Sequence, residues 1–481
     1  MFNMDYRNLG LKVGLEVHQQ LDTKHKLFCN CPLKRSLTFP IEVKRKLRPV
    51  AGELGQIDAA AMFQYLKDKE FIYQANTESS CLIELDEEPI RNLNSEALEI
   101  ALQVAKLLKA EIPNEIEIMR KIIIDGSSVS SFQRTALIAL NGELETSKGK
   151  IKIQTIALEE DSATPTKKEG TRIYYRLDRL GIPLIEIATE PAIDSPEYAK
   201  EVAERLGMIC RSTGKAKRGI GTIRQDINVS IAGGSRVEIK GVQELDSIPK
   251  IIENEVHRQS VLKGKVLEET RVAKPDGTTE FLRPLPGGER MYVETDAIPV
   301  IIPKDFLAKI KLPETWEDKE KRLSKILPKQ FVPQILRSEY LDWFEKHCKI
   351  CDPVLVAVTY TSTLKDLRRK EIPIENINSA QLAYIFNLVA DKRIAKEAIP
   401  ELLEFVANNP GIKETEILKQ KVVESIFETE LRKIIKEVIA KNPELARERK
   451  ISALMGDVMK TVRGKIDGII VARILEEELT Q

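Results

Sequence analysis

The sequence predicts an α+β protein, with a large domain built on a mainly antiparallel sheet, an all-α helical domain and a small helical tail domain. Three observations support this prediction. Up to about residue 300, strand-like segments are interrupted by helical ones; the strand signal fades near Leu312; and helical periodicity then continues to the C-terminus. A chain of 481 residues is long enough for about three domains at ~100–200 residues each. We expect their bounds at residues 1–301, 302–408 and 409–481.

The expected strands are segments in which apolar and polar residues alternate, because successive strand side chains point to opposite faces. They cover residues 12–21, 121–125, 150–160, 182–187, 223–231 and 236–240. A 3.6-residue period predicts helices over residues 95–109, 195–211 and 248–262, the second with Pro196 in its first turn. Residues 413–481 are expected to be helical, with breaks at Asn442-Pro443, Gly464 and Gly468.

Charge and hydropathy exclude several classes of protein. The 75 Lys and Arg residues nearly balance 74 Asp and Glu residues, so the chain is not a polycation and any nucleic-acid contact must come from local basic patches. No run of ~18 apolar residues occurs, so we expect no membrane span. The start of the chain lacks the basic and apolar regions of a secretory signal, and we expect a cytoplasmic protein.

Six cysteines form only two close pairs, Cys29/Cys31 and Cys348/Cys351. A structural zinc site usually takes two such pairs from one small module, whereas these pairs lie over 300 residues apart. Reduced structural thiols are therefore the favoured interpretation. A shared four-cysteine site would require the fold to bring the pairs together.

Side chains that could bind ligands or take part in a reaction concentrate on the polar faces of the expected strands. In residues 12–21, Val13, Leu15 and Val17 would face a core, which leaves Glu16 and His18 on the other face. The same alternation puts Arg224, Asp226, Asn228 and Ser230 in one row, and Glu160, Glu186, Glu238 and Lys240 stand on other strands. Short oxygen ligands at period two suit Mg²⁺, and interleaved cations suit phosphate or carboxylate. The alternative is an antiparallel sheet with one solvated face.

Two loops and the tail carry weaker signals. Residues 211–221 are rich in glycine and basic side chains and could wrap an anion with backbone N–H groups, or form a basic surface loop. Residues 125–134 form a hydroxyl-rich loop that could be only a turn. Residues 431–470 contain ten basic and five acidic residues, which predicts either a solvated helix face or an RNA contact. No P-loop, Rossmann or protein-kinase motif is present.

Motifs in order along the whole chain resemble the B/E subunits of tRNA-dependent amidotransferases. They lie at residues 14–23, 27–32, 158–161, 179–191, 224–230, 454–456 and 462–468. Within that family, Gln19-Gln20 and residues 124–127, 132–135 and 274–279 look like the archaeal E-type member (GatE). One departure is that the usual inserted domain, similar to one in bacterial aspartyl-tRNA synthetases, is absent near residues 247–268.

The resemblance implies a cradle domain that uses ATP and Mg²⁺ to phosphorylate the side-chain carboxylate of Glu-tRNA(Gln). Ammonia would then displace phosphate to give Gln-tRNA(Gln), the reaction of a carbon–nitrogen ligase with glutamine as amide donor. It also implies an asparaginase-like D-type partner (GatD), in an α2β2 complex, that releases ammonia from glutamine or asparagine. A B-type protein that also acts on Asp-tRNA(Asn), and a non-catalytic tRNA-binding protein, stay open as alternatives.

On this basis we expect Glu16, His18, Glu160, Asp226 and Arg224 to be catalytic, with Glu16, His18, Glu160 and Glu238 as metal ligands. Lys240, Glu186, Asn228 and Ser230 would bind ATP or substrate, and Ser127, Ser128, Ser131 and Gln133 would line the point where ammonia enters. The tail would contact tRNA through Arg449, Lys460, Arg463 and Lys465.

Overall fold

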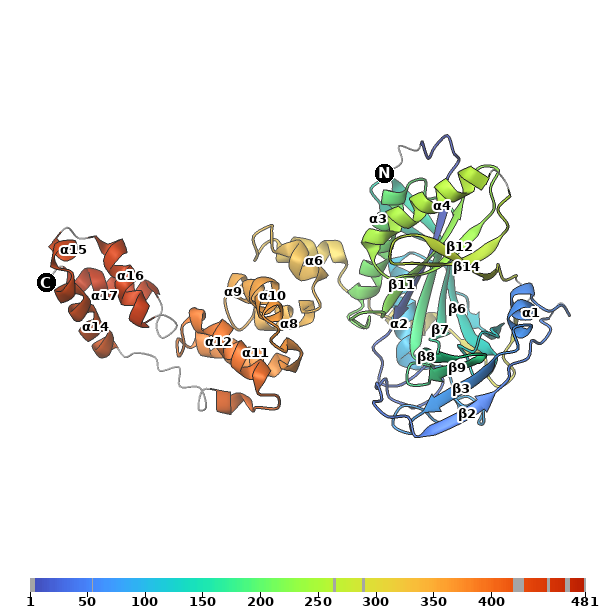
Figure 1. Cartoon of the computed structure of the whole chain (residues 1–481), viewed down its shortest axis with the longest axis horizontal. Helices are drawn as coiled ribbons and strands as arrows, with labels where there is room; N and C mark the ends of the chain where they lie inside the picture. The colour runs from blue at the N-terminus through green and yellow to red at the C-terminus, as the bar shows by residue number, and fades with distance from the viewer. Residues whose placement is uncertain are drawn as a thin grey trace. The chain divides into compact units, whose positions relative to one another are not determined.

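The computed structural model confirms the predicted α+β class. It describes residues 5–53, 55–262, 265–287, 290–417, 428–447, 450–462 and 468–479. The chain divides into two compact units, Met1–Trp316 and Glu317–Gln481. All described strands belong to the first unit, and the described elements of the second are helical (Figure 1). The first unit thus continues past residue 301, where we expected a domain to end.

A ten-stranded sheet forms the centre of the first unit. Its order is β14 (Thr279–Pro284), β13 (Glu269–Ala273), β12 (Val237–Val242), β11 (Ile223–Ser230), β1 (Lys12–Gln20), β10 (Pro183–Thr189), β7 (Gly149–Glu160), β6 (Phe132–Thr146), β5 (Ile118–Ile122) and β15 (Met291–Val293). Every neighbouring pair is antiparallel except β12 and β13. Strand β1 lies between β10 and β11, so both neighbours approach its polar residues.

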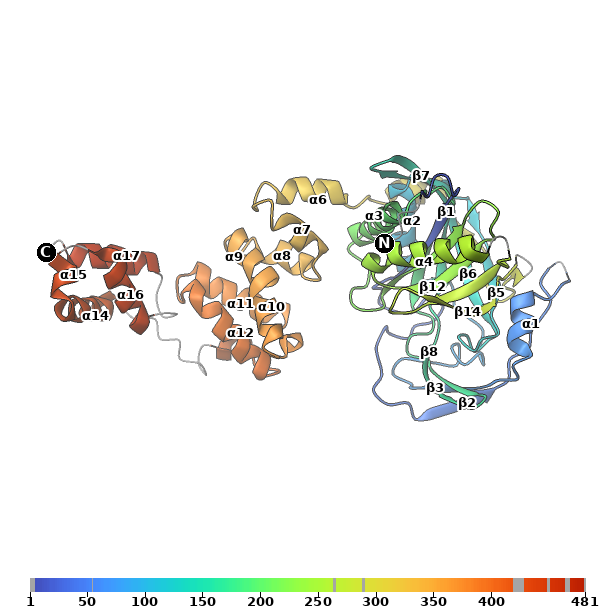
Figure 2. The same cartoon turned by 45° about the horizontal axis from the view of Figure 1, so that its top comes forward.

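The hydrophobic core lies where three helices pack on this sheet. They are α2 (Ser95–Leu107), α3 (Pro196–Ser212) and α4 (Ile248–Leu262), and α3 packs on β1 while α4 packs on β11 (Figure 2). Val13, Leu15 and Val17 are buried in this core, as the alternation predicted. Burying such a side chain contributes about 1.5–3 kcal/mol, which fixes which face of β1 is left for polar residues.

Helix α4 is the crossover between the two parallel strands β12 and β13. The described residues between those strands form a three-residue 3₁₀ turn (Leu245–Ser247), α4 and a short connection to β13. Parallel strands need such a crossover, usually a helix. The described residues of the segment near 247–268 therefore belong to this crossover and form no inserted domain.

A second sheet of four strands packs beside the first. Its order is β2 (Ile41–Arg45), β3 (Glu70–Ala75), β9 (Arg172–Arg176) and β8 (Thr164–Glu169). Phe71, Tyr73 and Tyr175 give it an aromatic core of its own, which also packs against the loop that joins β5 to β6. The remaining elements of this unit are α1 (Ala59–Tyr65), β4 (Glu115–Ile116), β16 (Val300–Ile301) and α5 (Lys304–Lys309).

Helices make up the rest of the described chain. They are α6 (Trp316–Leu323), α7 (Val332–Arg337), α8 (Leu341–His347), α9 (Pro353–Val358), α10 (Leu364–Arg369), α11 (Ser379–Ala390), α12 (Ile399–Asn408), α14 (Glu428–Lys441), α15 (Pro443–Arg447), α16 (Ile451–Val462) and α17 (Gly468–Glu478). Helices α14, α16 and α17 enclose a separate apolar core that includes Leu431, Leu454 and Ile474. Among the described residues, no helix combines the length and apolar character that crossing a membrane requires.

Candidate active site

The strand register brings the predicted polar residues onto one face of the central sheet. Glu16 pairs across from Asp226 on β11, and His18 pairs with Glu186 on β10 on one side and Arg224 on β11 on the other. Because directly opposed residues on antiparallel strands place their side chains on the same face, these five groups lie together. The predicted faces of β1 and β11 therefore agree with the structure.

His18 is the centre of this cluster. Its side chain is buried, and its Nε2 lies 2.9 Å from Oε2 of Glu186. Its Nδ1 is also buried but has no hydrogen-bond partner. Burial opposes protonation, yet the hydrogen bond and charge of Glu186 outweigh it and raise the pKa of His18 above its ordinary value. A buried ring nitrogen without a partner costs free energy unless something else binds it.

Lys240 on β12 neutralises the β11 and β12 side of the cluster. Its Nζ lies 2.7 Å from Oδ2 of Asp226 and 2.7 Å from Oε1 of Glu238, and the Gly241 N–H donates to Asp226. Burial alone would raise the pKa of Asp226 and of Glu238, but Lys240 lowers both. Burial would lower the pKa of Lys240, but the two carboxylates raise it. All three groups are therefore charged near neutral pH.

Glu16 differs from the other carboxylates because no described cation pairs with it. It accepts one hydrogen bond, from Asn228 Nδ2 at 3.1 Å. Burial, and then the nearby charges of Glu186, Glu238 and Asp226, raise the pKa of Glu16 to about 7, against the opposing effect of Lys240. The ligand atoms of Glu16, His18 and Asp226 lie within 4.8 Å of one another. This excess of negative charge and the unpartnered His18 Nδ1 fit a divalent cation.

Two residues of the cluster escaped the sequence prediction, Lys121 on β5 and Glu159 on β7. Lys121 pairs with Glu159, and its Nζ lies 3.7 Å from Glu186. Glu159 also accepts a hydrogen bond from Thr135 at 2.8 Å. Glu159, Glu186 and His18 form a second group whose ligand atoms all lie within 4.8 Å of one another. His18 is thus shared by two possible cation sites.

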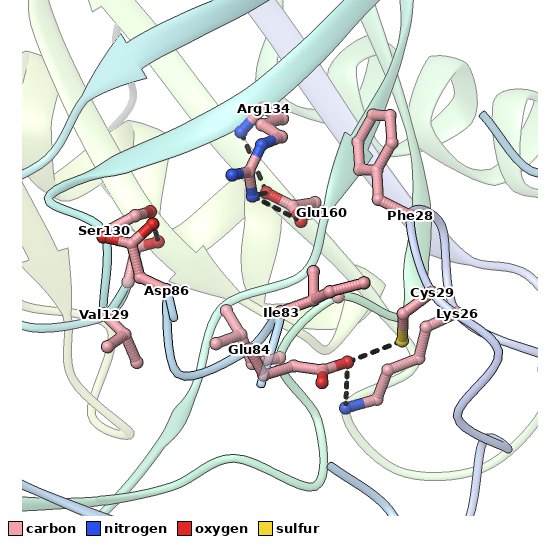
Figure 3. A pocket seen from close by; sticks show the side chains of 13 residues that line it. Lys26, Phe28, Cys29, Ile83, Glu84, Asp86, Val129, Ser130, Arg134 and Glu160 are labelled. Carbon is pink, nitrogen blue, oxygen red and sulfur yellow. Dashed lines mark hydrogen bonds and ion pairs between the residues drawn. The ribbon is translucent and has the colours of Figure 1, made fainter. Parts of the chain in front are cut away.

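Glu160 corrects the sequence prediction, because it does not lie with Glu16 and His18. Its carboxylate pairs with the Arg134 guanidinium at 3.3 Å and accepts a hydrogen bond from the Arg134 N–H. The neighbouring residues Gln133 and Thr135 bind Glu159 instead, so alternation places Glu159 and Glu160 on opposite faces of the sheet. Figure 3 shows Arg134 and Glu160 facing each other in a separate small pocket.

The other predicted residues lie in several places. Asn228 is in the cluster, Glu238 lies next to it on β12, and Ser230 pairs with Lys12 at the far end of β11.

The residues expected where ammonia enters lie on and beside the loop between β5 and β6. Gln133 donates to Glu159, Ser128 donates to the Phe132 carbonyl and Ser127 donates to Asp125. Ser131 has a positive φ of 69°. In the tail, Lys460 lies on α16, whereas Arg449, Arg463 and Lys465 lie outside the described residues.

All six cysteines are free thiols, in agreement with the favoured interpretation, and three of them lie close together. Cys29 and Cys31 are joined by Cys81 and Glu84, with all four ligand atoms within 4.8 Å of one another. Cys29 Sγ lies 2.8 Å from Glu84 Oε1, and Lys26 Nζ lies 3.2 Å from the same oxygen (Figure 3). Three thiols and a carboxylate are a donor set that fits zinc. Cys348 and Cys351 belong to the second unit and are not part of this group.

Comparisons with known proteins show the family to which the chain is similar. Residues 11–308 match the family described as GatB/GatE catalytic domain, and residues 342–479 match the family described as GatB domain. The chain is 36% identical to the E component of the glutamyl-tRNA(Gln) amidotransferase of Methanocaldococcus jannaschii, over 99% of this chain and 100% of that protein. It is 37% identical to the same component from Archaeoglobus fulgidus and 36% identical to that from Thermococcus gammatolerans, over 99% of each chain.

These alignments extend over more positions than this chain contains. The first spans 627 residues, whereas this chain has 481. The relatives therefore carry segments that this chain lacks. This agrees with the expected absence of an inserted domain.

Proposed function

This chain belongs to the GatB/GatE family of tRNA-dependent amidotransferase subunits, and we propose that it uses ATP to convert Glu-tRNA(Gln) into Gln-tRNA(Gln). The single observation that carries the proposal is the cluster around His18, which matches the requirements of phosphoryl transfer to a carboxylate. The curated relatives, all named as the E component and all from archaea, favour the E type over a B-type protein that also acts on Asp-tRNA(Asn).

ATP is needed because a carboxylate at neutral pH does not react with ammonia. In the first step a side-chain carboxylate oxygen of the glutamyl group attacks the γ-phosphorus of ATP, and ADP leaves. In the second step ammonia attacks the carbonyl carbon of this acyl phosphate, the bond from that carbon to the phosphate oxygen breaks, and inorganic phosphate leaves with the proton that the nitrogen loses. The reaction is that of a carbon–nitrogen ligase, and most of its catalysis comes from positioning and from cations near the phosphate oxygens.

The residues that would hold Mg²⁺ are Glu16, His18 and Asp226, with Glu159 and Glu186 beside them. Bound there, the ion would neutralise charge on the phosphate oxygens. The pairing of Glu160 with Arg134 removes it from this ligand set. Glu238 keeps Lys240 in place rather than binding the ion itself, through the 2.7 Å contact between Glu238 Oε1 and Lys240 Nζ.

Three cations border the cluster and would meet the substrates. Lys240 and Lys121 are each held by carboxylates, and Arg224 Nη1 lies 3.3 Å from Asp161 Oδ1. Held this way, each cation presents its charge to the same face without rearranging when substrate arrives. Such fixed charges can bind the phosphates of ATP and the reacting carboxylate.

Ammonia would come from a partner, an asparaginase-like D-type protein (GatD) that releases it from glutamine or asparagine within an α2β2 complex. The relatives are named as subunits, which supports the need for a partner. The Ser127–Ser128–Ser131 loop and Gln133 remain our proposal for where ammonia enters, because Gln133 connects that loop to Glu159.

The test measures formation of Gln-tRNA(Gln) from Glu-tRNA(Gln), ATP and Mg²⁺ with ammonium chloride as the nitrogen donor, so that no partner is required. We expect wild-type protein to form the product and Glu16→Gln and His18→Ala to lose at least 100-fold in rate. Lys12→Gln, at the exposed start of β1 and outside the cluster, is the control and should keep the rate. Full activity in either His18→Ala or Glu16→Gln would remove the proposed site.

A further inference from the structure

A cationic pocket opens at the end of β1, beside the cluster around His18. Its cavity volume is about 650 Å³. Most of its lining comes from three separate segments: residues 33–35, residues 176, 178 and 179, and the glycine-rich loop 217–222. Gln20, Thr164 and Ile182 complete it. We call it the basic pocket. The proposed function does not use it, although the glycine-rich loop overlaps residues 211–221, which the sequence indicates as either an anion-binding segment or a basic surface loop.

Positive charge dominates the basic pocket. Its lining contains six basic residues, Lys34, Arg35, Arg176, Arg179, Lys217 and Arg218, and among its described residues only one acid, Asp178. Burial and the charge of Arg35 lower the pKa of Lys217 despite Asp22 and Asp161, and Lys217 forms no ion pair with a described residue. Burial and the charges of Arg224 and Arg176 likewise lower the pKa of Arg179 despite Asp161. The cations thus repel one another, which an anionic ligand would relieve.

The loop 217–222 is held in position by β1. The buried Gln19 donates through Nε2 to the carbonyls of Lys217 at 2.9 Å and of Thr222 at 3.2 Å. The backbone adds two hydrogen bonds, from Lys217 N–H to the Gln20 carbonyl and from Gln20 N–H to the Thr222 carbonyl. Between these anchors Gly219 has φ of 114°, a value that favours glycine. The basic pocket is therefore a built site rather than a loose surface loop.

Gln20 connects the basic pocket to the reacting centre. Its Nε2 lies 2.5 Å from Asp161 Oδ2, and Asp161 also pairs with Arg224 at 3.3 Å and Arg179 at 3.8 Å. Gln20 lies on the same strand face as His18, two residues on, which is about 7 Å along the strand. A ligand in the basic pocket would therefore end within one nucleotide length of the cluster.

We propose that the basic pocket binds the phosphodiester backbone of the acceptor end of tRNA and so delivers the aminoacylated 3′ end to the His18 cluster. This inference rests on the proposed function and adds the residues that hold the RNA. The cations are distributed over three segments, which suits a chain with one charge per phosphate. The triphosphate of ATP carries concentrated charge that needs Mg²⁺ and its carboxylate ligands, and those lie in the cluster instead.

An apolar side chain at the rim also favours RNA. Ile220 stands between Gly219 and Gly221 with 93% of its surface exposed, although isoleucine is normally buried. Exposed apolar surface beside a backbone-binding groove can pack against an unstacked base. A phosphate ion or triphosphate alone would give Ile220 nothing to contact.

The test is binding of a fluorescein-labelled eight-nucleotide RNA ending in CCA to the full chain, without ATP or partner, followed by anisotropy across a range of NaCl concentrations. We expect the double variant Arg35→Gln/Lys217→Gln to bind at least 10-fold more weakly at low salt. The slope of log affinity against log salt should fall by about 0.7 for each lost phosphate contact. The matched control Lys44→Gln/Lys152→Gln removes two exposed lysines elsewhere on the same unit and should bind like wild type.

ATP binding, measured by equilibrium dialysis, separates the two sources of phosphate and should change less than two-fold in the double variant. Ile220→Glu, a change at a fully exposed position that leaves folding intact, should also weaken RNA binding at least 10-fold. RNA binding equal to the control would overturn the proposal. Loss of ATP binding alone would also overturn it, because the pocket would then bind the nucleotide. Equal loss of ATP and RNA binding would overturn it too, because the pocket would then attract any anion through its overall positive charge. A wild-type chain that binds RNA but forms no Gln-tRNA(Gln) would instead contradict the proposed function.

Discussion

Glu186 on β10 holds His18 on β1 by a 2.9 Å contact to Nε2, and this contact leaves the buried Nδ1 of His18 without a protein partner. A carboxylate that binds one ring nitrogen fixes the ring and directs the other nitrogen toward a ligand. A cation bound by His18 would also be within reach of Glu16 and Asp226, because the ligand atoms of the three residues lie within 4.8 Å of one another.

Replacing Glu186 with Gln should weaken divalent-cation binding while preserving the fold. The amide keeps the size of the side chain but removes the charge that favours the metal-binding orientation of His18. Partners of this kind are worth about 10–100-fold in metal affinity, so the Mg²⁺ concentration for half-maximal amidation should rise by that factor. The measurement is the initial rate against Mg²⁺ concentration, with Lys12→Gln as the control. An unchanged Mg²⁺ requirement would show that Glu186 does not orient His18.

Two adjacent glutamates should behave differently when each is changed to Gln. Glu159→Gln alters the cluster around His18 and should lower the amidation rate at least 10-fold. Glu160→Gln should retain its Mg²⁺ requirement but unfold at a lower temperature, because the buried Arg134 loses one of the two carboxylates, Glu160 and Glu294, with which it pairs. Weakening such a buried charge-assisted hydrogen bond costs about 1–3 kcal/mol. Rates and thermal unfolding of both variants decide the matter, and the reverse pattern would restore Glu160 as the ligand.

That contrast also marks the limit of the sequence prediction. Alternation along β1 and β11 gave the correct faces, because both strands keep one register across their mutual pairing. On β7 the register shifts near Thr155, where β10 pairs first with Thr155 and then with Ile153. If strict alternation is continued from Ile151 and Ile153 at the start of β7, Glu160 is wrongly placed on the polar face. After the shift Ile156 and Leu158 face the core, so Glu159 takes the polar face instead.

Other features of the site depend on contacts between distant segments and could not be read from patterns. Lys121 reaches the cluster because β5 is added to the sheet through β6, and nothing local in its strand indicates an ion pair with Glu159. Cys81 joins Cys29 and Cys31 only because two loops meet. Spacing within one segment predicts faces and elements, whereas pairings between segments far apart in the sequence need the fold.

The cysteine cluster should bind zinc. We expect about one zinc per chain in protein purified without chelator, and loss of that zinc in Cys81→Ser, because three thiolates and a carboxylate complete a four-ligand set. Metal analysis measures the content, and thermal unfolding should show a lower midpoint in the variant. Cys210→Ser, at a buried cysteine far from the others in sequence, is the control and should keep the zinc. Zinc-free wild-type protein with unchanged stability would contradict this expectation.

His347 should make the second unit less stable in acid. The ring is buried, with Nδ1 2.6 Å from the Tyr360 hydroxyl, and burial followed by the charge of Lys346 lowers the pKa of His347. Because the folded state takes up its proton at lower pH than the unfolded state, the stability is complete above the unfolded pKa near 6.5. It decreases as the pH falls from about 6.5 toward the folded value.

The measurement for this effect is the thermal unfolding midpoint of the full chain between pH 7.5 and 5, compared with that of His347→Gln. The variant should lose less stability over that interval than the wild type, since it has no proton to take up. Parallel curves for the two proteins would show that His347 does not contribute to the pH dependence.

The most direct test of the account is the position of Mn²⁺, used in place of Mg²⁺, in anomalous difference density from crystals of the full chain. The account predicts a peak bonded to His18 Nδ1 or within reach of it, together with carboxylate oxygens of Glu16 and Asp226 or of Glu159 and Glu186. A peak beside Glu160 and Arg134 instead, or none near His18 in protein that forms Gln-tRNA(Gln), would contradict it.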